Sequence, residues 1–450
     1  MQCLLLVAIL PGAGRLVAGD GVRVGAATVD LKAADSMEIA GGIHPGTARG
    51  QEGKLRAVAI VLEKNGVKLA IVTLDILMIT RDILDPAVTA IEKATGIPGA
   101  NVLINCTHTH HAPSTMRVHG YGADLGFTVR VQKGIVEAVT RAHAALSDDE
   151  CAFHFRLGRE ETVGQNSRQL LPDGRIYWIG SRKFVRPTGP FDPELPVLAF
   201  RNRASAGSEA VAGTLKAVIF NHSTHTIGTI KPGVRSPSFY GLAGQRLEAE
   251  LGGVFSFVEG ASGSTHNLNL SCADATDRIA KAVRESLAKA EPRPVARLAA
   301  RKRPFKFNVR TFDEEAEEAA VSYYCGKWVG DYGPRVVPVF REMRRQLAPV
   351  QGEVRETWVQ AMVIGDVAIV GVPAEFFTKL GVDIKNRSPY RYTYVAELAN
   401  DWIGYLPDQD AHKLGGYQVW TGFHSYAEPG TGERIVDEAI ALLKELKAEE

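Results

Sequence analysis

The chain has few cysteines, and those it has follow no pattern. The five, Cys3, Cys106, Cys151, Cys272 and Cys325, are scattered along 450 residues, and no Cys-x-x-Cys pair occurs among them. A disulfide framework pairs an even number of cysteines, and a thiolate zinc site uses closely spaced pairs. The sequence therefore predicts neither a disulfide scaffold nor a thiolate metal site.

The chain also lacks an excess of charge and lacks long hydrophobic runs. Its formal net charge is +1, so no global field draws it toward nucleic acid or an anionic membrane. No segment has the length and apolarity of a transmembrane helix, and no internal repeat or low-complexity tract is apparent. Hydrophobic residues make up 45% and charged residues 23%, which is ordinary for a globular protein able to bury a large core.

The first ten residues are an apolar run that is too short to cross a bilayer. Pro11 and Gly12 follow it, and small residues lie near Ala18 and Gly19. This order is typical of a secretory signal peptide, so we predict a signal over residues 1–19 and a secreted or periplasmic protein. No Lys or Arg precedes the apolar run, and a buried strand is the alternative.

From residue 20 onward, strand-like and helix-like segments alternate, which predicts an α/β fold with a mixed β-sheet core flanked by helices. Asn65-Gly66 between two apolar runs predicts a hairpin, and Gly365-Asp366 predicts a second. We expect one catalytic domain over residues 20–450, with a basic connector at 291–310 and a solvated charged helical region up to about residue 348. The expected strands are 22–29, 55–62, 67–74, 101–105, 215–220, 254–258, 358–364 and 367–372, and the expected helices are 81–95, 126–146, 275–290 and 432–446.

Three of the chain's 12 histidines fall within four residues, directly after the strand predicted at 101–105. If the strand continues, its alternation puts His108 and His110 on one face while His111 points away. A His-x-His pair at a strand end is a candidate metal site. The alternative is that these are polar residues that end a strand and form ordinary hydrogen bonds.

A second histidine group repeats this arrangement, because His222 and His225 follow the strand predicted at 215–220. Two such strand ends can meet at one site, where imidazoles from separate elements bind zinc. A carboxylate is the usual third ligand, and Glu375 follows the strand predicted at 367–372. Glu375 could instead be an acidic residue near the start of a helix, where it would interact favourably with the helix dipole.

Five short motifs occur in an order that resembles one known family. They are Thr107-His-Thr-His110, Asn221-His-Ser-Thr-His225, Val258-Glu-Gly-Ala-Ser-Gly263, Val372-Pro-Ala-Glu375 and Asn400-Asp-Trp-Ile-Gly-Tyr405. Together they resemble the motifs of the neutral/alkaline, non-lysosomal ceramidases, and the similarity extends over residues 22–446. The resemblance implies the catalytic domain of that family, zinc amidohydrolases that cleave N-acyl sphingoid bases. The chain is too short for the additional C-terminal β-sandwich of those ceramidases.

The resemblance also implies roles for particular residues. His108, His225, Glu375 and Tyr405 match the zinc ligands, although Tyr405 could be a hydrogen-bond donor instead of a ligand. His110 matches the histidine that contacts the reacting amide. Arg168, in Asn166-Ser-Arg168, resembles the arginine that helps to hold the oxyanion.

One segment departs from the family pattern. Ceramidases continue the glycine-rich segment into Gly-Asp-x-Ser-Pro, whose serine is needed for catalysis, whereas this chain reads Gly263-Ser-Thr-His-Asn267. His266 therefore occupies the serine position, where it could be a third imidazole near the metal, a general acid or base, or a packed loop residue. Ser264 beside it lacks the Gly-x-Ser-x-Gly setting of a nucleophile.

These features predict a zinc-dependent hydrolase that cleaves an amide (N-acyl) bond with metal-activated water. The departure at His266 makes a smaller soluble substrate as reasonable as a lipid-like one. Two alternatives stay open: a zinc esterase or lactonase that uses the same site, and a binding homologue that has lost catalysis. No nucleic-acid partner is expected.

Overall fold

The computed structural model describes residues 20–178, 185–203, 213–267 and 270–450. The predicted signal peptide over residues 1–19 therefore lies outside the described residues. Within the described ranges, no helix is both long enough and apolar enough to span a bilayer.

Three sheets dominate the structure, and each contains both antiparallel and parallel strand pairs. The order of strands is β1-β4-β5-β6 in the first sheet, β14-β13-β12-β7-β16 in the second and β17-β18-β19-β21 in the third. Their bounds are β1 Arg23–Asp30, β4 Arg56–Lys64, β5 Val67–Leu74, β6 Val102–Cys106, β7 Ala152–Arg159, β12 Glu194–Arg201, β13 Leu215–His222, β14 Val254–Glu259, β16 Glu291–Arg293, β17 Leu298–Asn308, β18 Val354–Ile364, β19 Val367–Gly371 and β21 Tyr392–Ala396.

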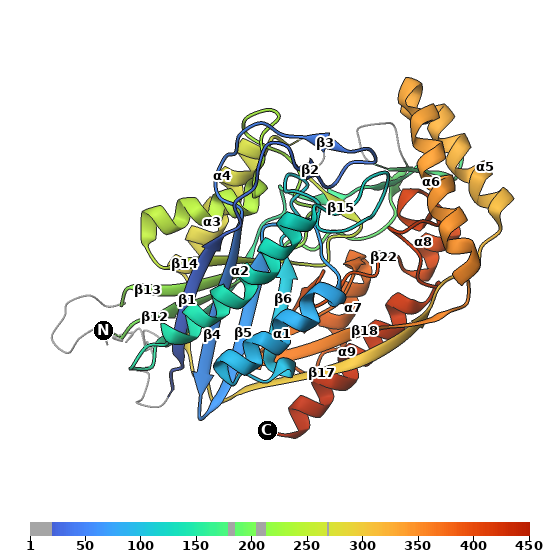
Figure 1. The fold of residues 1–450 in the computed structure, drawn as a ribbon. Coiled ribbons are helices and arrows are strands. Elements are labelled where there is room, and N and C mark those ends of the chain that lie inside the picture. The colour runs from blue at the N-terminus through green and yellow to red at the C-terminus, as the bar shows by residue number, and fades with distance from the viewer. Residues whose placement is uncertain (1–19, 179–184, 204–212, 268–269) are drawn as a thin grey trace, which may run out of the picture.

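Helices cover one face of each sheet, while the other faces meet in a common core (Figure 1). Helices α1 and α2 pack on the first sheet, α3 and α4 on the second, and α7 and α9 on the third. α5 and α6 form a pair that stands out at the edge of the molecule (Figure 1). The bounds are α1 Arg81–Thr95, α2 Leu125–Ala144, α3 Ser238–Leu251, α4 Cys272–Ala288, α5 Glu314–Tyr324, α6 Gly333–Leu347, α7 Thr378–Arg387, α8 Gln409–Leu414 and α9 Thr431–Ala448.

Strand β4 shows how alternation builds these layers. Ala57, Ala59 and Val61 belong to the core under α1 and α2, while Ile60 and Leu62 belong to the core that the three sheets share. Because successive side chains on a strand point to opposite faces, a sheet buried on both faces needs apolar residues at nearly every position. The run from residue 57 to 62 meets this requirement.

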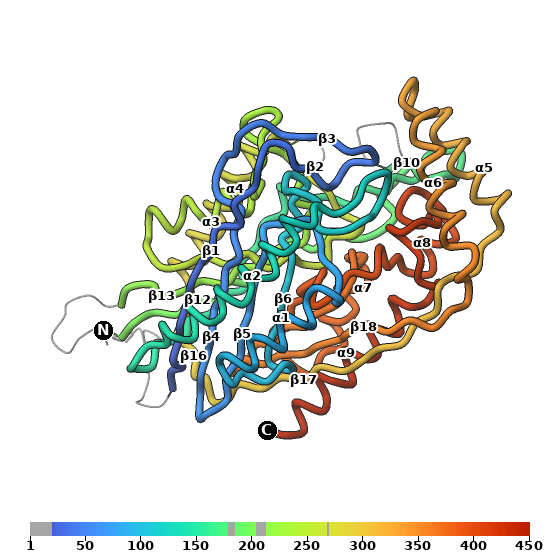
Figure 2. The backbone as a smooth tube through the Cα atoms, in the orientation of Figure 1, coloured from blue at the N-terminus to red at the C-terminus, as the bar shows by residue number. Residues whose placement is uncertain are grey.

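The same connection occurs once in each sheet. An antiparallel pair (β4–β5, β12–β13, β18–β19) is followed by a helix (α1, α3, α7) and then by a strand parallel to the second member of the pair (β6, β14, β21). The chain path can be followed through these three units in Figure 2. No internal repeat is apparent in the sequence, so this is a repeat of topology.

Short strands and single turns of helix complete the fold. The short strands are β2 Glu38–Ile39, β3 Gly46–Thr47, β8 Gln165–Asn166, β9 Arg168–Leu170, β10 Ile176–Trp178, β11 Arg186–Pro187, β15 Thr265–His266, β20 Glu375–Phe376 and β22 Tyr405–Leu406, and the short helices are η1 Gly99–Asn101, η2 Cys325–Val329, η3 Gly330–Tyr332, η4 Ala348–Val350 and η5 Tyr417–Val419.

The predicted α/β class with a mixed sheet core flanked by helices is confirmed, and so are both hairpins. Asn65 and Gly66 have positive φ angles of 51° and 80°, as the tight turn between β4 and β5 requires. The C-terminal residues that the structure describes end in α9, and no β-sandwich follows the third sheet within them.

The predicted connector at 291–310 is wrong. It contains β16 and the 11-residue strand β17, which pairs with β18 along its whole length. The basic run lies on the edge strand of the third sheet and faces acidic residues of α9: Arg303 contacts Glu438 at 2.7 Å and Glu445 at 2.8 Å. The charges therefore match a neighbouring helix and do not mark a linker.

Candidate metal centre

The polar residues singled out in the sequence lie at the carboxyl ends of the parallel strand pairs. His108 and His110 follow β6, His225 follows β13, and Glu375 follows β19. The parallel pairs β5–β6, β13–β14 and β19–β21 come one from each sheet. Because the three sheets share a core, these strand ends meet, and the predicted convergence of the two histidine groups is confirmed.

The two histidines after β6 meet for a reason different from the predicted one. The strand ends at Cys106, and His108 has a φ of +59°, so the chain turns before either histidine. Backbone bonds fix the turn: Thr107 N donates to Leu74 O at 2.9 Å and His110 N to Thr226 O at 3.3 Å. A left-handed residue and these bonds, and not strand alternation, bring the two Nε2 atoms to 3.4 Å.

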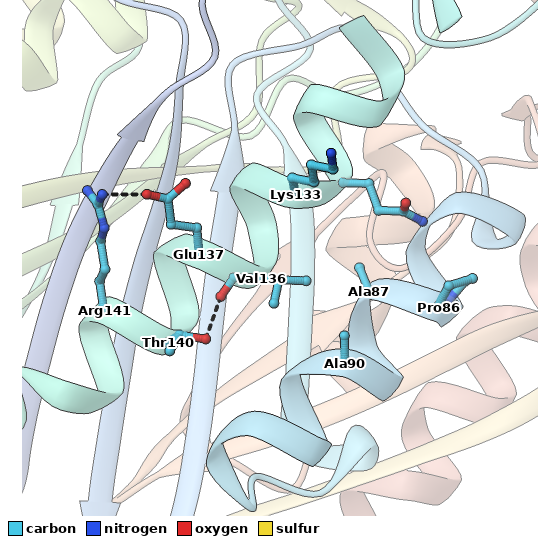
Figure 3. Close-up of a pocket in the computed structure, with 9 residues that line it drawn as sticks. Pro86, Ala87, Ala90, Lys133, Val136, Glu137, Thr140 and Arg141 are labelled. Atoms are coloured by element: carbon cyan, nitrogen blue, oxygen red, sulfur yellow. Dashed lines mark hydrogen bonds and ion pairs between the residues drawn. The ribbon is translucent and has the colours of Figure 1, made fainter. Parts of the chain in front are cut away.

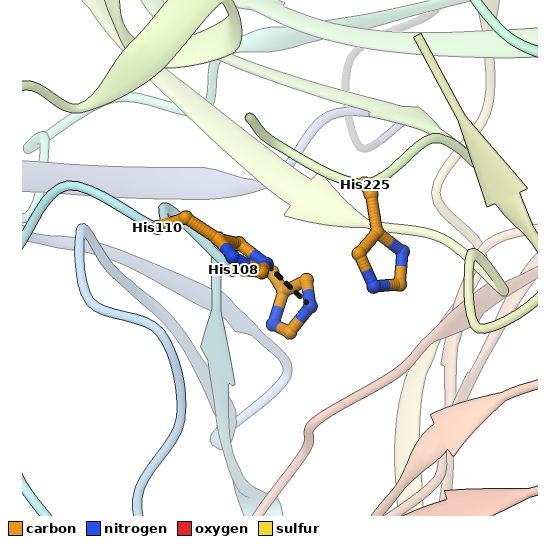
Figure 4. Close-up of side chains that lie close together, drawn as sticks. All are labelled: His108, His110 and His225. Atoms are coloured by element: carbon orange, nitrogen blue, oxygen red, sulfur yellow. Dashed lines mark hydrogen bonds between the residues drawn. The ribbon is translucent and has the colours of Figure 1, made fainter. Parts of the chain in front are cut away.

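Four side-chain groups converge at this point, and two of them, His108 and His225, are shown with the neighbouring His110 in Figure 4. Glu375 Oε2 lies 3.4 Å from His108 Nε2 and 3.5 Å from His225 Nε2. The Tyr405 hydroxyl lies 3.0 Å from His225 Nε2. All four residues are buried. Four donors placed 2.0–2.2 Å from a tetrahedral centre would stand about 3.3–3.6 Å apart, so these spacings fit a metal ion of the size of zinc.

The hydrogen bonds at the Nδ1 atoms of the histidines also fit a metal site. The Nδ1 atoms of His108, His225 and His110 each face a backbone carbonyl, on Leu77 at 3.1 Å, Ser262 at 3.0 Å and Gly41 at 3.2 Å. A carbonyl can only accept, so Nδ1 carries a hydrogen and each Nε2 is free to direct a lone pair at the centre. This is how ligand histidines are held in metal sites.

The pKa shifts of these residues show that the buried Glu375 carboxylate is balanced by a positive charge on the imidazoles beside it. Burial alone would lower the pKa of His108, but the Glu375 carboxylate beside it outweighs burial and raises that pKa above 6.5. Burial would raise the pKa of Glu375, yet His108 and His225 hold it well below 4.5. For His225 and His110, burial and then His108 lower the pKa. Without a metal, a proton on His108 supplies the positive charge that the carboxylate requires.

Five side chains could donate to a metal ion at this point, whereas a tetrahedral site needs four. His108, His110 and His225 form a compact cluster able to hold a metal ion. Glu375 is within hydrogen-bonding distance of His108, His225 and Tyr405, whereas His110 contacts the group through His108. Five candidate donors therefore lie together, namely His108, His110, His225, Glu375 and Tyr405.

Trp402 and Glu397 support the group, and sequence reasoning missed both. Trp402 Nε1 donates to Glu375 Oε1 at 3.1 Å and fixes the second carboxylate oxygen. Glu397 is fully buried directly after β21, the same kind of position that drew attention to Glu375. It could have been found from that signal.

Glu397 connects the segments that carry the donors. Its Oε2 accepts from Phe376 N at 2.8 Å, next to Glu375, and from Ser262 N at 2.9 Å. Its Oε1 accepts from Ser262 Oγ at 2.6 Å, and Ser262 O in turn holds His225 Nδ1. Its carbonyl accepts from Asn105 Nδ2, in the strand before His108. Glu397 thus links the backbone segments through which all three sheets supply their candidate donors.

A cavity of about 490 Å³ opens over this group. Its walls combine imidazoles, aromatic rings and small polar residues, and no Lys, Arg, Asp or Glu is among the described residues that line it. They are Gly41, Gly42, Ile43, His110, His111, Ser167, Trp178, His225, Ile227, Thr265, His266, Tyr405, Tyr417 and Gln418. The size lies within the range of small-molecule sites.

His266 and His111 both line this cavity. β15 brings His266 next to His225, with ring centroids 6.1 Å apart, and burial followed by the charges of His225 and His108 lowers its pKa to about 3. His111 does not belong to the cluster of His108, His110 and His225, although it lines the cavity. Its Nε2 accepts from Gly228 N at 2.9 Å, which holds the ring against the cavity wall.

Arg168 is buried near the cavity but does not line it. Its Nη2 donates to Gly415 O at 2.6 Å and to Ala411 O at 3.2 Å, and its Nη1 donates to Gln418 Oε1 at 3.0 Å. These acceptors engage both terminal nitrogens of the guanidinium. The geometry gives no support to a direct oxyanion contact from Arg168 and instead makes it the support of the 411–418 segment.

A second hollow of about 470 Å³ lies between α1 and α2 (Figure 3). It is lined by Pro86, Ala87, Ala90 and the exposed side of α2, where Glu137 pairs with Arg141. No histidine or cysteine lines it, and it lies outside the converging strand ends. The chemistry belongs to the cavity over the histidines.

Comparison with known proteins adds the fold family. Neither a family model nor a curated protein sequence matches the chain. Among solved structures, the neutral ceramidase from Pseudomonas aeruginosa matches with a TM-score of 0.69 and 19% identity over 94% of this chain and 75% of that one. A structure described as ceramidase complexed with C2 matches with a TM-score of 0.72 and 17% identity over 95% of this chain and 76% of that one. The chain therefore has the neutral ceramidase fold.

We expect the chain to bind one zinc ion, with an affinity that falls on acidification. The metal must displace the proton of His108, whose pKa Glu375 raises against the opposing effect of burial. Competition with a chromogenic chelator should show steady weakening from about pH 8 to about pH 5.5. His225→Ala should weaken binding more than about 100-fold, beyond the loss typical of an outer contact. His143→Gln, on α2, is the control, and an affinity indifferent to pH and to His225 would contradict the site.

We also expect Glu397→Ala to weaken zinc binding by about 10- to 100-fold, because the loops that carry His225 and Glu375 lose their common acceptor. Glu397→Gln keeps an oxygen for the two backbone N–H groups and should bind within a few-fold of the original protein. Glu259→Ala removes an equally buried carboxyl whose Oε2 accepts from Thr226 Oγ1, and it controls for general loss of stability. Equal weakening in both alanine variants would assign the effect to stability alone.

Proposed function

We propose that the protein is a zinc-dependent hydrolase that cleaves an amide (N-acyl) bond in a small, uncharged or lipid-like substrate. The observation that carries this proposal is the convergence of four proposed ligands beneath an open cavity: Glu375 Oε2 lies 3.4 Å from His108 Nε2 and 3.5 Å from His225 Nε2, and the Tyr405 hydroxyl lies 3.0 Å from His225 Nε2. The shared ceramidase fold and the order of the five motifs support the same reaction class. A zinc ion held there would lower the pKa of water toward 7 and polarise an acyl carbonyl.

Tyr405 suits the fourth ligand position. Burial, and then the Glu375 charge, raise the pKa of its phenol well above 10, so the metal-free protein keeps it protonated as a donor to His225 Nε2. Only a cation could reverse that balance at neutral pH. The residue is therefore either the fourth ligand or a donor to the group, and its position serves both.

His110 is the proton carrier next to the ligand set. Its Nδ1 hydrogen is held by Gly41 O, so Nε2 carries the lone pair that can take a proton from the attacking water. Burial and the neighbouring histidines lower its pKa well below 6.5, so the protonated ring is a strong acid that returns the proton to the leaving nitrogen. An amine leaving group needs that proton, which favours an amide as the substrate.

The walls of the cavity favour a substrate without formal charge. Among the described lining residues only the histidines can carry positive charge, and burial lowers the pKa of His111 to about 4 and that of His266 to about 3. A carboxylate or phosphate placed against these walls would lose its water without gaining a positively charged side chain as a partner. Trp178 stacks on Tyr417 with ring centroids 4.1 Å apart and gives the cavity an aromatic wall for an apolar acyl or amine group.

The second candidate is an esterase or lactonase on the same site. His266, where ceramidases have a catalytic serine, favours it, because the altered residue lies on the substrate side of the cavity while every proposed ligand is kept. An alkoxide leaves more readily than an amine and needs less help from an acid. Secretion, suggested by residues 1–19, is compatible with both candidates.

A matched panel of uncharged N-acyl and O-acyl fluorogenic substrates tests the proposal. We expect zinc-loaded protein to hydrolyse the N-acyl compounds, chelation to abolish turnover, and added zinc to restore it. Turnover of O-acyl compounds alone would select the second candidate. Stoichiometric zinc without turnover of either class would leave a binding homologue.

His110→Gln should lower kcat by about 10²- to 10⁴-fold, the usual contribution of a positioned acid or base. Zinc content should stay at one ion per chain, because His110 lies beside the proposed ligand set. Measuring kcat and bound zinc in the same preparation separates the two effects. His143→Gln makes the same substitution on α2 and should leave both unchanged; loss of zinc in His110→Gln would instead make His110 a ligand.

A further inference from the structure

Gln418 is a buried amide in the wall of the cavity. It lies in η5, is 1% exposed and lines the cavity together with Tyr405, His110 and His225. Its sequence neighbourhood carries no motif, and nothing in the spacing of the histidines points to it. Its role follows from its hydrogen bond with Arg168.

Arg168 fixes which way the Gln418 amide faces. A guanidinium has five N–H donors and no acceptor, so the group that Gln418 presents to Nη1, 3.0 Å away, must be its Oε1. The NH₂ group of Gln418 is then turned away from Arg168. It forms no hydrogen bond with any of the described residues, although the side chain is almost fully buried.

Besides Tyr405, which belongs to the proposed ligand set, three hydroxyl groups of described residues line the cavity, and all three have already used their hydrogens. Ser167 Oγ donates to Ser264 O at 3.2 Å, and Thr265 Oγ1 donates to Ser223 O at 2.8 Å. Tyr417 donates to His119 Nε2 at 3.2 Å, because Gly42 O holds the other nitrogen of that ring. Each hydroxyl has one hydrogen, so these three have none left for a substrate.

We propose that Gln418 Nε2 donates a hydrogen bond to the acyl carbonyl oxygen of the substrate, and that Arg168 is the positioning residue that aims it. This inference rests on the proposed hydrolase function and identifies the donor for the oxygen on which negative charge develops. An amide locked in place by a guanidinium is a preorganised dipole in a cavity with little water, where such a contact is strong. It also accounts for the buried arginine: Arg168 acts on the reaction through Gln418.

Two substitutions at Gln418 test the donor. Gln418→Glu keeps the partner of Arg168 but removes the NH₂ group, and Gln418→Met removes both polar ends at similar volume. We expect kcat on an uncharged N-acyl anilide to fall about 10²- to 10³-fold in both, as for other single oxyanion donors. KM should change by less than about threefold and zinc affinity should be unchanged, because the contact strengthens only as charge develops.

Gln169→Met is the matched control. Gln169 is next to Arg168, equally buried at 3% exposure and outside the cavity, and its Nε2 donates to Asn166 O. The same substitution there should reproduce any general loss of packing while kcat stays within about threefold. If Gln169→Met lowers kcat as much as Gln418→Met, the inference is overturned.

A double-mutant cycle separates the two roles. Arg168→Met should lower kcat in the original protein, but it should add less than about threefold in the Gln418→Met background, because the residue it positions is gone. Full additivity would mean that Arg168 contacts the substrate itself and would overturn the positioning role. Should Arg168→Met fail to fold, the pair Gln418→Glu and Gln418→Met still tests the donor.

A binding measurement keeps this inference distinct from the proposed function. Benzohydroxamate, a metal-binding acyl probe, should bind zinc-loaded protein about 10- to 100-fold more weakly in Gln418→Glu than in the original, with zinc affinity equal in both. If no substrate of the panel is hydrolysed, the proposed function fails, and this comparison still decides the donor. Equal benzohydroxamate affinity in the two proteins, or an unchanged kcat where turnover exists, would overturn it.

Discussion

Two imidazole lone pairs and a carboxylate directed at one buried point are the constraint on which the rest of the site depends. Glu375 Oε2 lies 3.4 Å from His108 Nε2 and 3.5 Å from His225 Nε2, and backbone carbonyls behind the two rings prevent them from turning away. Such an arrangement is unfavourable unless a cation or a proton occupies the centre. A rigid scaffold must therefore hold it, and the parallel strand ends of the three sheets provide one.

The threefold occurrence of hairpin, helix and parallel strand explains why these ends meet. Each unit places its parallel pair beside the shared core, and residues at the ends of β6, β14 and β21 then bond across the sheets: Glu259 N to Asn105 Oδ1 at 3.0 Å, and Glu397 N to Glu259 O at 3.0 Å. Asn221 Nδ2 reaches the carbonyls of Val258 and Val395, both at 2.9 Å. Loops anchored in this way can hold donors to within tenths of an ångström, which a metal site requires.

The sequence revealed the candidate donors because buried strands appear as short apolar runs, and few polar residues follow those runs. His108, His225 and Glu375 were found in that way, and Glu397 could have been. The turn at His108 could not, since its positive φ comes from bonds to Leu74 and Thr226 that are far away in the sequence. Nor could β17, whose basic run is explained only by the acidic face of α9, or the link between Arg168 and Gln418, 250 residues apart.

The two sides of the cavity come from different parts of the fold. The ligand groups follow the long strands β6, β13 and β19 or pair beside them, whereas Trp178, His266 and Gln418 come from short strands and single turns around the rim. Rim segments can change without disturbing donors held by the sheet core. This division explains how the motifs that resemble zinc ligands can all persist while the serine position carries His266. In the proposed hydrolase, activation of the bond would depend on the residues at the strand ends, and recognition of the substrate would depend on the residues of the rim.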